Sequence, residues 1–251
     1  MRLILALIIG LGAWTAQADE SEWRPPFITT PPEVVERMLQ MAGTRPDDLV
    51  IDLGSGDGRI VIAAARKFGA RGLGIELDGT LVKKSRESAA VAGISEKVRF
   101  VQGDVLVADI SKATVVTAYL LPALMVKLQS RFIDELAPGT RIVSHAFTMA
   151  GWAPDRTETV KLSGRHRGQG DESRLHLWVV PADVRCVWRA DGLQLRIEQN
   201  YQRIEIDGAS RASLSGRDIA WQKDGLDFRG RVEGNRMVGE LSGRAIELLR
   251  R

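Results

Sequence analysis

The sequence has almost no cysteine. Its 251 residues contain one, Cys186, so an internal disulfide is excluded. It also lacks a C-x-x-C pair and any cysteine–histidine cluster, the spacings typical of structural metal sites. We therefore expect no metal, and we interpret Cys186 as a small buried apolar side chain rather than a reactive thiol.

The chain also lacks low-complexity tracts and blocks of like charge. Its composition, 44% hydrophobic and 27% charged, is that of a globular protein. The formal net charge is +3, and the basic residues are dispersed along the chain. Because phosphate binding usually requires a clustered basic face, we expect no nucleic acid as a partner.

Long apolar runs are absent except at the N-terminus. Arg2 precedes an apolar run from Leu3 to Trp14, and the small residues Ala16 and Ala18 come just before an acidic stretch. The run is shorter than the roughly 20 residues of a membrane span, and its three parts are typical of a signal peptide. We predict that residues 1–18 are a signal peptide that exports the protein to the periplasm. A retained anchor is the alternative, and it would also hold the chain outside the cytoplasm.

Beyond this leader, short apolar runs alternate with helical segments. We expect helices at 31–43, 58–69, 80–93 and 122–136, and strands at 48–54, 72–77, 97–104, 113–120 and 140–147. Such alternation is typical of an α/β doubly wound domain, a parallel sheet with helices on both faces.

The pattern then changes to strands alone. Runs at 158–164 and 173–182 would complete a seven-stranded, mostly parallel sheet with an antiparallel edge pair. Period-two runs follow at 193–199, 202–208, 218–223 and 226–234, separated by glycine turns. We therefore predict a first domain, built on the seven-stranded sheet, over 19–182, and a small antiparallel β-meander or barrel-like domain over 183–251.

A glycine turn, GSGDG, lies between the first strand and the helix after it. Glycines at this point let the backbone approach a ligand and present N–H groups at a helix N-terminus. The spacing is not that of dinucleotide-binding proteins, because Arg59 stands where their third glycine would be. Asp52 adds a carboxylate that would repel a pyrophosphate and suits a cation or an ammonium group.

The motif D-x-G-x-G-x-G, which begins at Asp52, resembles that of class I S-adenosylmethionine-dependent methyltransferases at every position. Two further acids, Glu76 and Asp104, follow the second and third strands, where that family binds the ribose hydroxyls and the adenine amino group. Either acid alone could be a surface charge at a strand end. The resemblance implies S-adenosyl-L-methionine as the cofactor and a class I methyltransferase domain over 19–182.

The segments 25–39, 49–78, 113–122 and 141–152 are similar to bacterial relatives of the ATP synthase c-subunit lysine N-methyltransferase family. The likeness covers roughly residues 23–182 and implies that the P-F-x-x-T-P segment folds over the cofactor. Capping of the first helix is an alternative role for Thr30, and a charge at a helix N-terminus is one for Asp57. The cofactor-binding residues that we predict are Thr30, Pro31, Asp52, Gly54, Ser55, Gly56, Asp57, Gly58, Glu76, Asp104 and Val105.

The segment from Tyr119 to Pro122 stands where class I enzymes carry a substrate motif. It does not spell the N/D-P-P-Y of enzymes that methylate amides or adenine, which favours an amine acceptor. We predict Tyr119 and His145 as catalytic residues that line a channel in which a lysine loses its proton. Plain packing is the alternative for each, as it is for Phe27 and Trp152.

The sequence thus predicts an S-adenosylmethionine-dependent N-methyltransferase whose acceptor is a protein lysine. In-line displacement at a sulfonium needs alignment of the reacting atoms above all. Two alternatives stay open: a small-molecule methyltransferase, and an exported, non-catalytic S-adenosylmethionine-binding protein. Export favours the second, because the cofactor is made in the cytoplasm, whereas the intact set of cofactor residues disfavours it.

Overall fold

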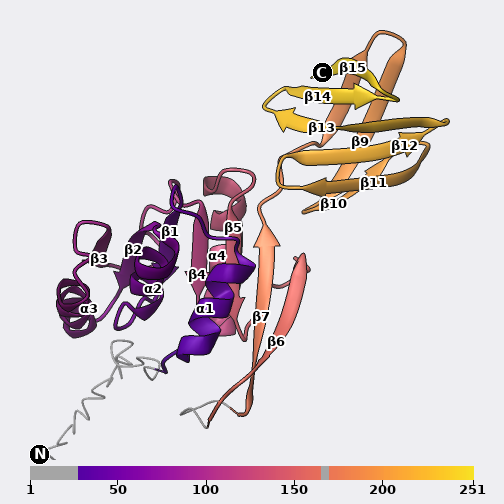
Figure 1. The fold of residues 1–251 in the computed structure, drawn as a ribbon. Helices are drawn as coiled ribbons and strands as arrows, with labels where there is room; N and C mark the ends of the chain where they lie inside the picture. Colours follow the sequence, from indigo (N-terminus) through magenta and orange to yellow (C-terminus); the bar gives the residue numbers. More distant parts are fainter. Residues whose placement is uncertain (1–27, 165–169) are drawn as a thin grey trace, which may run out of the picture.

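Two β-sheets, one after the other along the chain, organise the protein (Figure 1). Its structure is a computed structural model that describes residues 28–164 and 170–251. The predicted signal peptide, residues 1–18, and Phe27 lie outside the described residues. In the described ranges, none of the helices has the length and apolar character that crossing a membrane requires.

The first sheet has seven strands in the order β3-β2-β1-β4-β5-β7-β6. They are β1 Leu49–Leu53, β2 Arg71–Glu76, β3 Val98–Gln102, β4 Val115–Ala118, β5 Arg141–His145, β6 Arg156–Lys161 and β7 Glu172–Val179. Strands β1 to β5 are parallel, whereas β7 is antiparallel to both β5 and β6. The predicted seven-stranded doubly wound sheet with an antiparallel edge pair is confirmed.

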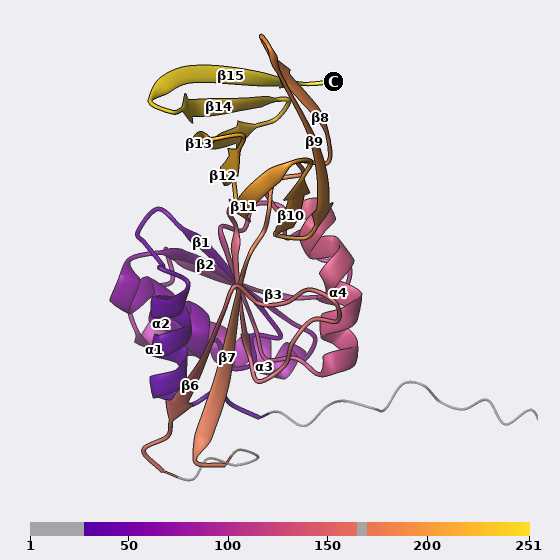
Figure 2. The same ribbon diagram turned by 90° about the vertical axis from the view of Figure 1, so that its right-hand side faces the viewer.

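The strands of this sheet carry apolar side chains on both faces, and helices cover both faces. The helices are α1 Pro32–Met41, α2 Arg59–Phe68, α3 Gly79–Val91 and α4 Pro122–Glu135. Figure 2 shows α1 and α2 on one side of the sheet and α4 on the other. Ile51 and Leu53 of β1 pack into the core on the α4 side, and Val50 packs into the core under α1 and α2. This alternation is the two-residue period of a strand.

Strands β4 and β5 are shorter than the apolar runs that predicted them, and both end before those runs do. Strand β4 stops before Tyr119, and β5 stops at His145. Ala146 follows with a φ of 69°, a left-handed conformation that costs a non-glycine residue about 1–2 kcal/mol. The chain leaves the sheet here, so Tyr119 and Phe147 stand on the loops after β4 and β5.

The second sheet has eight antiparallel strands in the order β10-β9-β8-β15-β14-β13-β12-β11. They are β8 Cys186–Ala190, β9 Leu193–Asn200, β10 Arg203–Ile206, β11 Ala209–Ser215, β12 Asp218–Lys223, β13 Leu226–Glu233, β14 Arg236–Leu241 and β15 Arg244–Arg250. The last strand pairs with the first, with Leu249 opposite Arg189. The sheet curls into a nearly closed barrel around Trp188, Trp221 and Phe228 (Figure 2).

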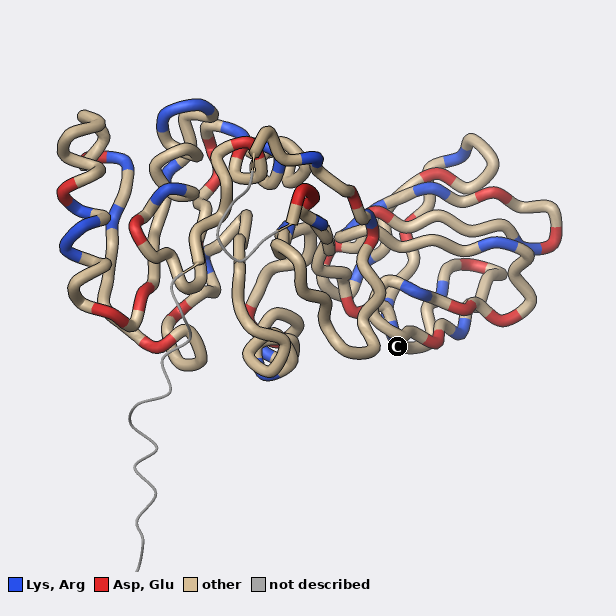
Figure 3. Tube along the Cα trace, turned by 90° about the horizontal axis from the view of Figure 1, so that it is seen from below, with Lys and Arg blue, Asp and Glu red and all other residues tan. Residues whose placement is uncertain are grey.

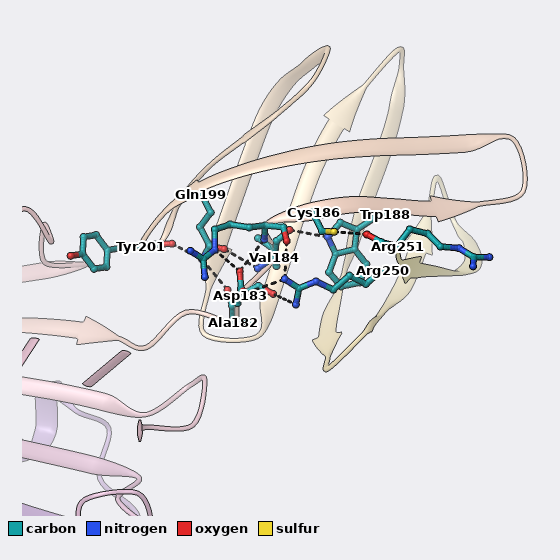
Figure 4. Close-up of polar contacts among 10 residues, drawn as sticks. Ala182, Asp183, Val184, Cys186, Trp188, Gln199, Tyr201, Arg250 and Arg251 are labelled. Carbon is teal, nitrogen blue, oxygen red and sulfur yellow. Dashed lines mark hydrogen bonds and ion pairs between the residues drawn. The ribbon is translucent and has the colours of Figure 1, made fainter. Parts of the chain in front are cut away.

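The barrel's two chain ends meet in a polar cluster (Figure 4). The carboxylate of Asp183 accepts hydrogen bonds from Arg185 at 2.8 Å and Arg250 at 3.0 Å, and these bonds hold its pKa at about 2. Cys186 donates from Sγ to the carbonyl of Arg251 and is partly exposed, so the expectation of a buried apolar cysteine is wrong. The thiol lies where β8 meets the chain end, which leaves it at the edge of the barrel core.

Tyr201 joins the barrel to the core of the first sheet. It occupies the turn between β9 and β10 with a φ of 54°, and its ring stacks on Trp152 at 5.0 Å between centroids. Gln129 of α4 donates its side-chain N–H to the Tyr201 hydroxyl. Trp152 is 1% exposed, so it is a core residue rather than a pocket wall.

A stability prediction follows from Gly230 and Gly239, which face each other across β13 and β14. A Cβ at Gly239 would lie 2.2 Å from the carbonyl oxygen of Arg229, so the backbone would have to move. We expect Gly239→Ala to lower the free energy of unfolding by about 1–3 kcal/mol, measured by thermal unfolding with far-UV circular dichroism. Gly164→Ala is the control, because an added methyl there meets no atom of the described residues within 4 Å. An unchanged Tm in Gly239→Ala would contradict this close approach.

Candidate active site

The carboxyl ends of the parallel strands meet along one edge of the first sheet. The register places Leu53 opposite both Ile75 and Ala118, and Ala118 opposite Ser144. The residues that follow these positions therefore stand side by side. Ligands of doubly wound sheets bind at this edge, where the loops after the strands converge.

The turn after β1 has a conformation that favours glycine. Gly54, Gly56 and Gly58 have φ values of 74°, 54° and 81°. A Cβ at Gly58 would lie 2.7 Å from the ring of Phe100, and one at Gly54 would lie 2.8 Å from Leu120. The turn therefore lies tight against the sheet, and α2 starts directly after it, with its first N–H groups toward this edge.

Asp52 is buried under the turn. The hydroxyl of Thr117 on β4 donates to its carboxylate at 2.7 Å, and the residue is 2% exposed. Burial raises the pKa of Asp52 to about 7, the Thr117 hydrogen bond opposes this shift, and the negative charges of Glu76 and Asp57 add to it. A cation bound beside the turn would favour the ionised form of Asp52.

Glu76 and Asp104 stand at the ends of neighbouring strands. The two carboxylate oxygens of Glu76 accept hydrogen bonds from the backbone N–H groups of Gly56 at 2.8 Å and Asp78 at 3.0 Å. Asp104 is exposed and accepts from the N–H of Leu106 at 2.8 Å. Both carboxylates are oriented by the backbone, and each keeps lone pairs for a ligand that carries hydroxyl or amino donors.

These residues fit S-adenosyl-L-methionine, and three of the predicted contact residues have side chains that are buried or paired within the protein. Ser55 turns its Oγ inward against Gly74 of β2, where it is buried and has no hydrogen-bond partner among the described residues. Val105 is 8% exposed and packs in the sheet's core. Asp57 binds the guanidinium of Arg59 through both carboxylate oxygens, at 2.9 and 2.7 Å. Burial alone would raise the pKa of Asp57, but the hydrogen bonds and charge of Arg59 outweigh it and lower that pKa.

Thr30 and Pro31 come just before α1, and Thr30 lies beside the end of β5. Pro31 is the N-cap of α1 without a side-chain capping bond, and the hydroxyl of Thr30 lies 3.2 Å from Nδ1 of His145. The Thr30 side chain thus contacts the end of β5 instead of capping the helix. Thr30 and Pro31 are buried here, beside the loop that follows β5.

Tyr119, His145 and Phe147 form an aromatic group at the ends of β4 and β5. The rings of Tyr119 and His145 are 4.1 Å apart, and those of Tyr119 and Phe147 are 6.1 Å apart and nearly parallel. Nε2 of His145 lies 3.0 Å from the Ser173 hydroxyl. Burial lowers the pKa of His145 to about 4, so its imidazole is neutral at pH 7.

Sequence reasoning missed four residues that position this site. Thr117 and Ser173 are the hydroxyl partners of Asp52 and His145. Arg131 of α4 donates to the carbonyls of Val105 and Ala108 at 2.7 and 2.6 Å, which fixes the loop after Asp104. Arg59 links the turn to Thr30 by donating to its carbonyl at 2.9 Å. No spacing signal marks these residues, because each has a partner on an element distant in sequence.

Comparison with known proteins agrees with this geometry. The ANTKMT methyltransferase domain matches residues 52–156. A protein-lysine N-methyltransferase of Saccharolobus islandicus (strain REY15A) is 41% identical over 130 residues, 51% of this chain and 81% of that protein. The ATP synthase c-subunit lysine N-methyltransferase of Mus musculus is 36% identical over 132 residues, which are 53% of this chain and 53% of that relative's length.

A solved structure is also similar. The crystal structure of an RNA methyltransferase from Salinibacter ruber, in complex with S-adenosyl-L-homocysteine, is 50% identical with a TM-score of 0.57. The match covers 62% of this chain and 96% of that one.

The fold and the glycine turn define the protein as a class I S-adenosylmethionine-dependent methyltransferase. Within that class, the chain belongs to the family of the ANTKMT methyltransferase domain. Its cofactor is S-adenosyl-L-methionine, as predicted, and the recognition of the family from the sequence is confirmed. The individual contact residues stay predictions.

The pKa of Asp52 predicts how stability depends on pH in the cofactor-free protein. Its pKa is about 7 in the folded chain against 3.8 for the free group, so the folded state holds its proton longer. Stability therefore falls as the pH rises from about 4 to about 7, by up to about 4 kcal/mol from this group. We expect Asp52→Asn to remove this fall, measured by urea unfolding at each pH. If the stability of Asp52→Asn fell with pH as steeply as that of the unsubstituted chain, Asp52 would not be the group that causes the fall.

A second prediction concerns the carboxylate at the end of β3. We expect Asp104→Ala to weaken S-adenosyl-L-methionine binding about 10-fold or more, because a hydrogen bond to a charged group is lost. Calorimetric titration measures the change. Asp109→Ala is the matched control, because Asp109 is also exposed and likewise accepts from a backbone N–H two residues on, at 2.9 Å. Equal affinities of the two variants would remove Asp104 from the cofactor site.

Proposed function

We propose that this chain is a protein-lysine N-methyltransferase. The observation that carries the proposal is an aromatic cavity of about 450 Å³ at the carboxyl ends of β4 and β5, beside β7. Its lining residues are Tyr119, His145, Ala146, Phe147, Thr159, Glu172, Ser173 and Arg174. The similarity to a protein-lysine N-methyltransferase that the chain covers over 81% of its length supports the same acceptor class.

The cavity has the chemistry that an amine acceptor needs. Faces of Tyr119 and Phe147 attract an ammonium or methylammonium group by cation–π interaction. Glu172 and Arg174 are both exposed at the lining: the carboxylate attracts a cationic side chain to the mouth, and the guanidinium opposes this attraction. The substrate segment from Tyr119 to Pro122, which lacks the motif of amide and adenine methyltransferases, agrees with an amine.

The cavity also prepares the acceptor for reaction. A lysine with a pKa near 10.4 must lose its proton before it can attack, and the loss of water around the side chain on entering the cavity disfavours the charged form. The proton leaves to water as the side chain enters. The cofactor supplies a methyl group on a sulfonium, so a nitrogen–carbon bond forms as the carbon–sulfur bond breaks and the sulfur becomes neutral.

Tyr119 and His145 have different parts in this proposal. Hydroxyl groups lie at both ring nitrogens of His145, so its imidazole is held in place. It supports the ring of Tyr119, which lines the path of the acceptor. Because alignment of nitrogen, methyl carbon and sulfur decides the rate, a fixed Tyr119 ring favours transfer.

The similar structure from Salinibacter ruber is described as an RNA methyltransferase, so RNA is the second candidate acceptor. Figure 3 shows basic and acidic residues interspersed along the described residues, with no segment of basic residues alone, which favours protein over RNA. Small molecules are the third candidate.

The experiment that tests the proposed function is transfer of labelled methyl groups. Chain lacking residues 1–18 is mixed with labelled S-adenosyl-L-methionine and with protein or RNA from separated cytoplasmic and envelope fractions, with Asp52→Ala as control. A labelled protein band that yields methyllysine on hydrolysis supports the proposal. Label in RNA, or only in small molecules, would overturn it.

The compartment is part of the proposal. We infer that the protein is exported, because the leader predicted at residues 1–18 precedes the fold. Fractionation of cells with antibody detection tests this. Uncleaved protein in the cytoplasm would contradict export and would bring the enzyme to its cofactor supply.

Substitution of Tyr119 tests the cavity. We expect Tyr119→Ala to lower kcat about 100-fold, because the acceptor loses the wall that aligns it. The matched control is Tyr201→Ala, since Tyr201 is the other tyrosine of the chain and lies at the barrel contact. Methyl transfer by Tyr119→Ala at the rate of the control would place the acceptor elsewhere.

A further inference from the structure

Arg59 connects two parts of the site that are separate in sequence. Its Nε and Nη2 bind both carboxylate oxygens of Asp57 in the glycine turn, at 2.9 and 2.7 Å. Its Nη1 donates to the carbonyl of Thr30, at 2.9 Å. A two-point guanidinium–carboxylate pair has a fixed orientation, so the main chain of Thr30 is tied to the turn.

Thr30 in turn holds the aromatic group. Its hydroxyl, on a residue that is 4% exposed, lies 3.2 Å from Nδ1 of His145. The opposite ring nitrogen is 3.0 Å from the Ser173 hydroxyl, and the ring centroid is 4.1 Å from that of Tyr119. Displacement of Thr30 would break one of the two bonds that orient the imidazole and would loosen the wall of the cavity.

The C-terminal end of α1 has a similar arrangement, at a distance from the glycine turn. Arg141 binds Asp48 at 2.7 Å and donates from Nε to the carbonyl of Ala42, the C-cap of α1, at 3.0 Å. Arg141 begins β5, so this tie lies at the opposite edge of the sheet. The two arginines hold the two ends of α1 in the same way, but only Arg59 has the glycine turn and the His145 contact on its two sides.

We propose that Arg59 is a positioning residue that couples the cofactor turn to the acceptor cavity through Thr30 and His145. A ligand that orders the turn thereby orders the ring of His145, and the coupling is reciprocal. The inference rests on the proposed function, since it takes the cavity as the acceptor site. The coupling itself is a property of the ligand-binding turn and can be measured without an acceptor.

The test measures binding of S-adenosyl-L-homocysteine to the chain lacking residues 1–18 by calorimetry, and the ring signals of His145 by nitrogen-15 NMR. The sequence has three histidines, so His145→Gln assigns the signal. In the unsubstituted chain, we expect saturating ligand to shift the His145 signal. In Arg59→Met, we expect affinity to fall about 10-fold and the ligand-induced shift to disappear at saturation.

Thr30→Val separates the two halves of the connection. Valine keeps the main-chain carbonyl that Arg59 binds but removes the hydroxyl that contacts His145. At a ligand concentration that saturates this variant, we expect no ligand-induced shift of His145. Arg141→Met is the matched control, and we expect it to lower Tm but keep the shift.

A direct effect of the ligand on the ring would survive both Arg59→Met and Thr30→Val, and a full shift in either variant would overturn the coupling. Arg59→Lys, which keeps the charge, covers the case in which Arg59→Met does not fold, and its shift should be reduced. If the unsubstituted chain shows the shift but methylates no lysine, the proposed function fails and the coupling stands. If the ligand does not bind or does not shift His145, the coupling fails whatever the acceptor.

Discussion

The parallel register of three central strands is the constraint on which the site depends. Leu53 lies opposite Ala118, and Ala118 lies opposite Ser144. The residues that come next along the chain, Gly54, Tyr119 and His145, therefore lie side by side. A shift of one residue in either pairing would turn every side chain of a strand to the other face. The buried apolar residues on both faces hold this register. The packed core therefore brings the glycine turn and the proposed acceptor cavity side by side, whatever direct contacts they make.

Negative charge gathers around the glycine turn. Asp52, Asp57 and Glu76 surround one turn, and burial of Asp52 makes its ionisation costly. Arg59 compensates Asp57, while backbone N–H groups support Glu76. A ligand that carries a sulfonium and an ammonium group would offset the remaining negative charge. The turn thus holds unfavourable electrostatic energy that the binding of a cation relieves.

Only some strands of the barrel could be predicted from the sequence pattern. The runs that predicted β9, β10, β12 and β13 alternate large apolar and polar residues, and each became a strand. Strand β11 has the sequence ASRASLS, in which Leu214 is the one buried residue, so the sequence shows no clear period of two. Strands β8, β14 and β15 also lacked a prediction, and the pairing of β8 with β15 joins the first strand of the barrel to the last. Such pairing joins residues about sixty positions apart, which no local pattern encodes.

The fold class and the glycine turn could be predicted from the sequence, because apolar periodicity and glycine spacing are local properties of the chain. The cofactor followed from the resemblance of the D-x-G-x-G-x-G motif to class I methyltransferases. The folded chain alone shows which hydroxyls contact Asp52 and His145, that Ser55 Oγ faces inward, that Trp152 lies in the core and that Arg59 binds Thr30. These contacts join residues up to 115 positions apart, and they form only when both faces of the sheet are packed. The physical reason is that a hydrogen-bond partner is chosen by proximity in the folded chain, and the sequence specifies that proximity only through the whole core.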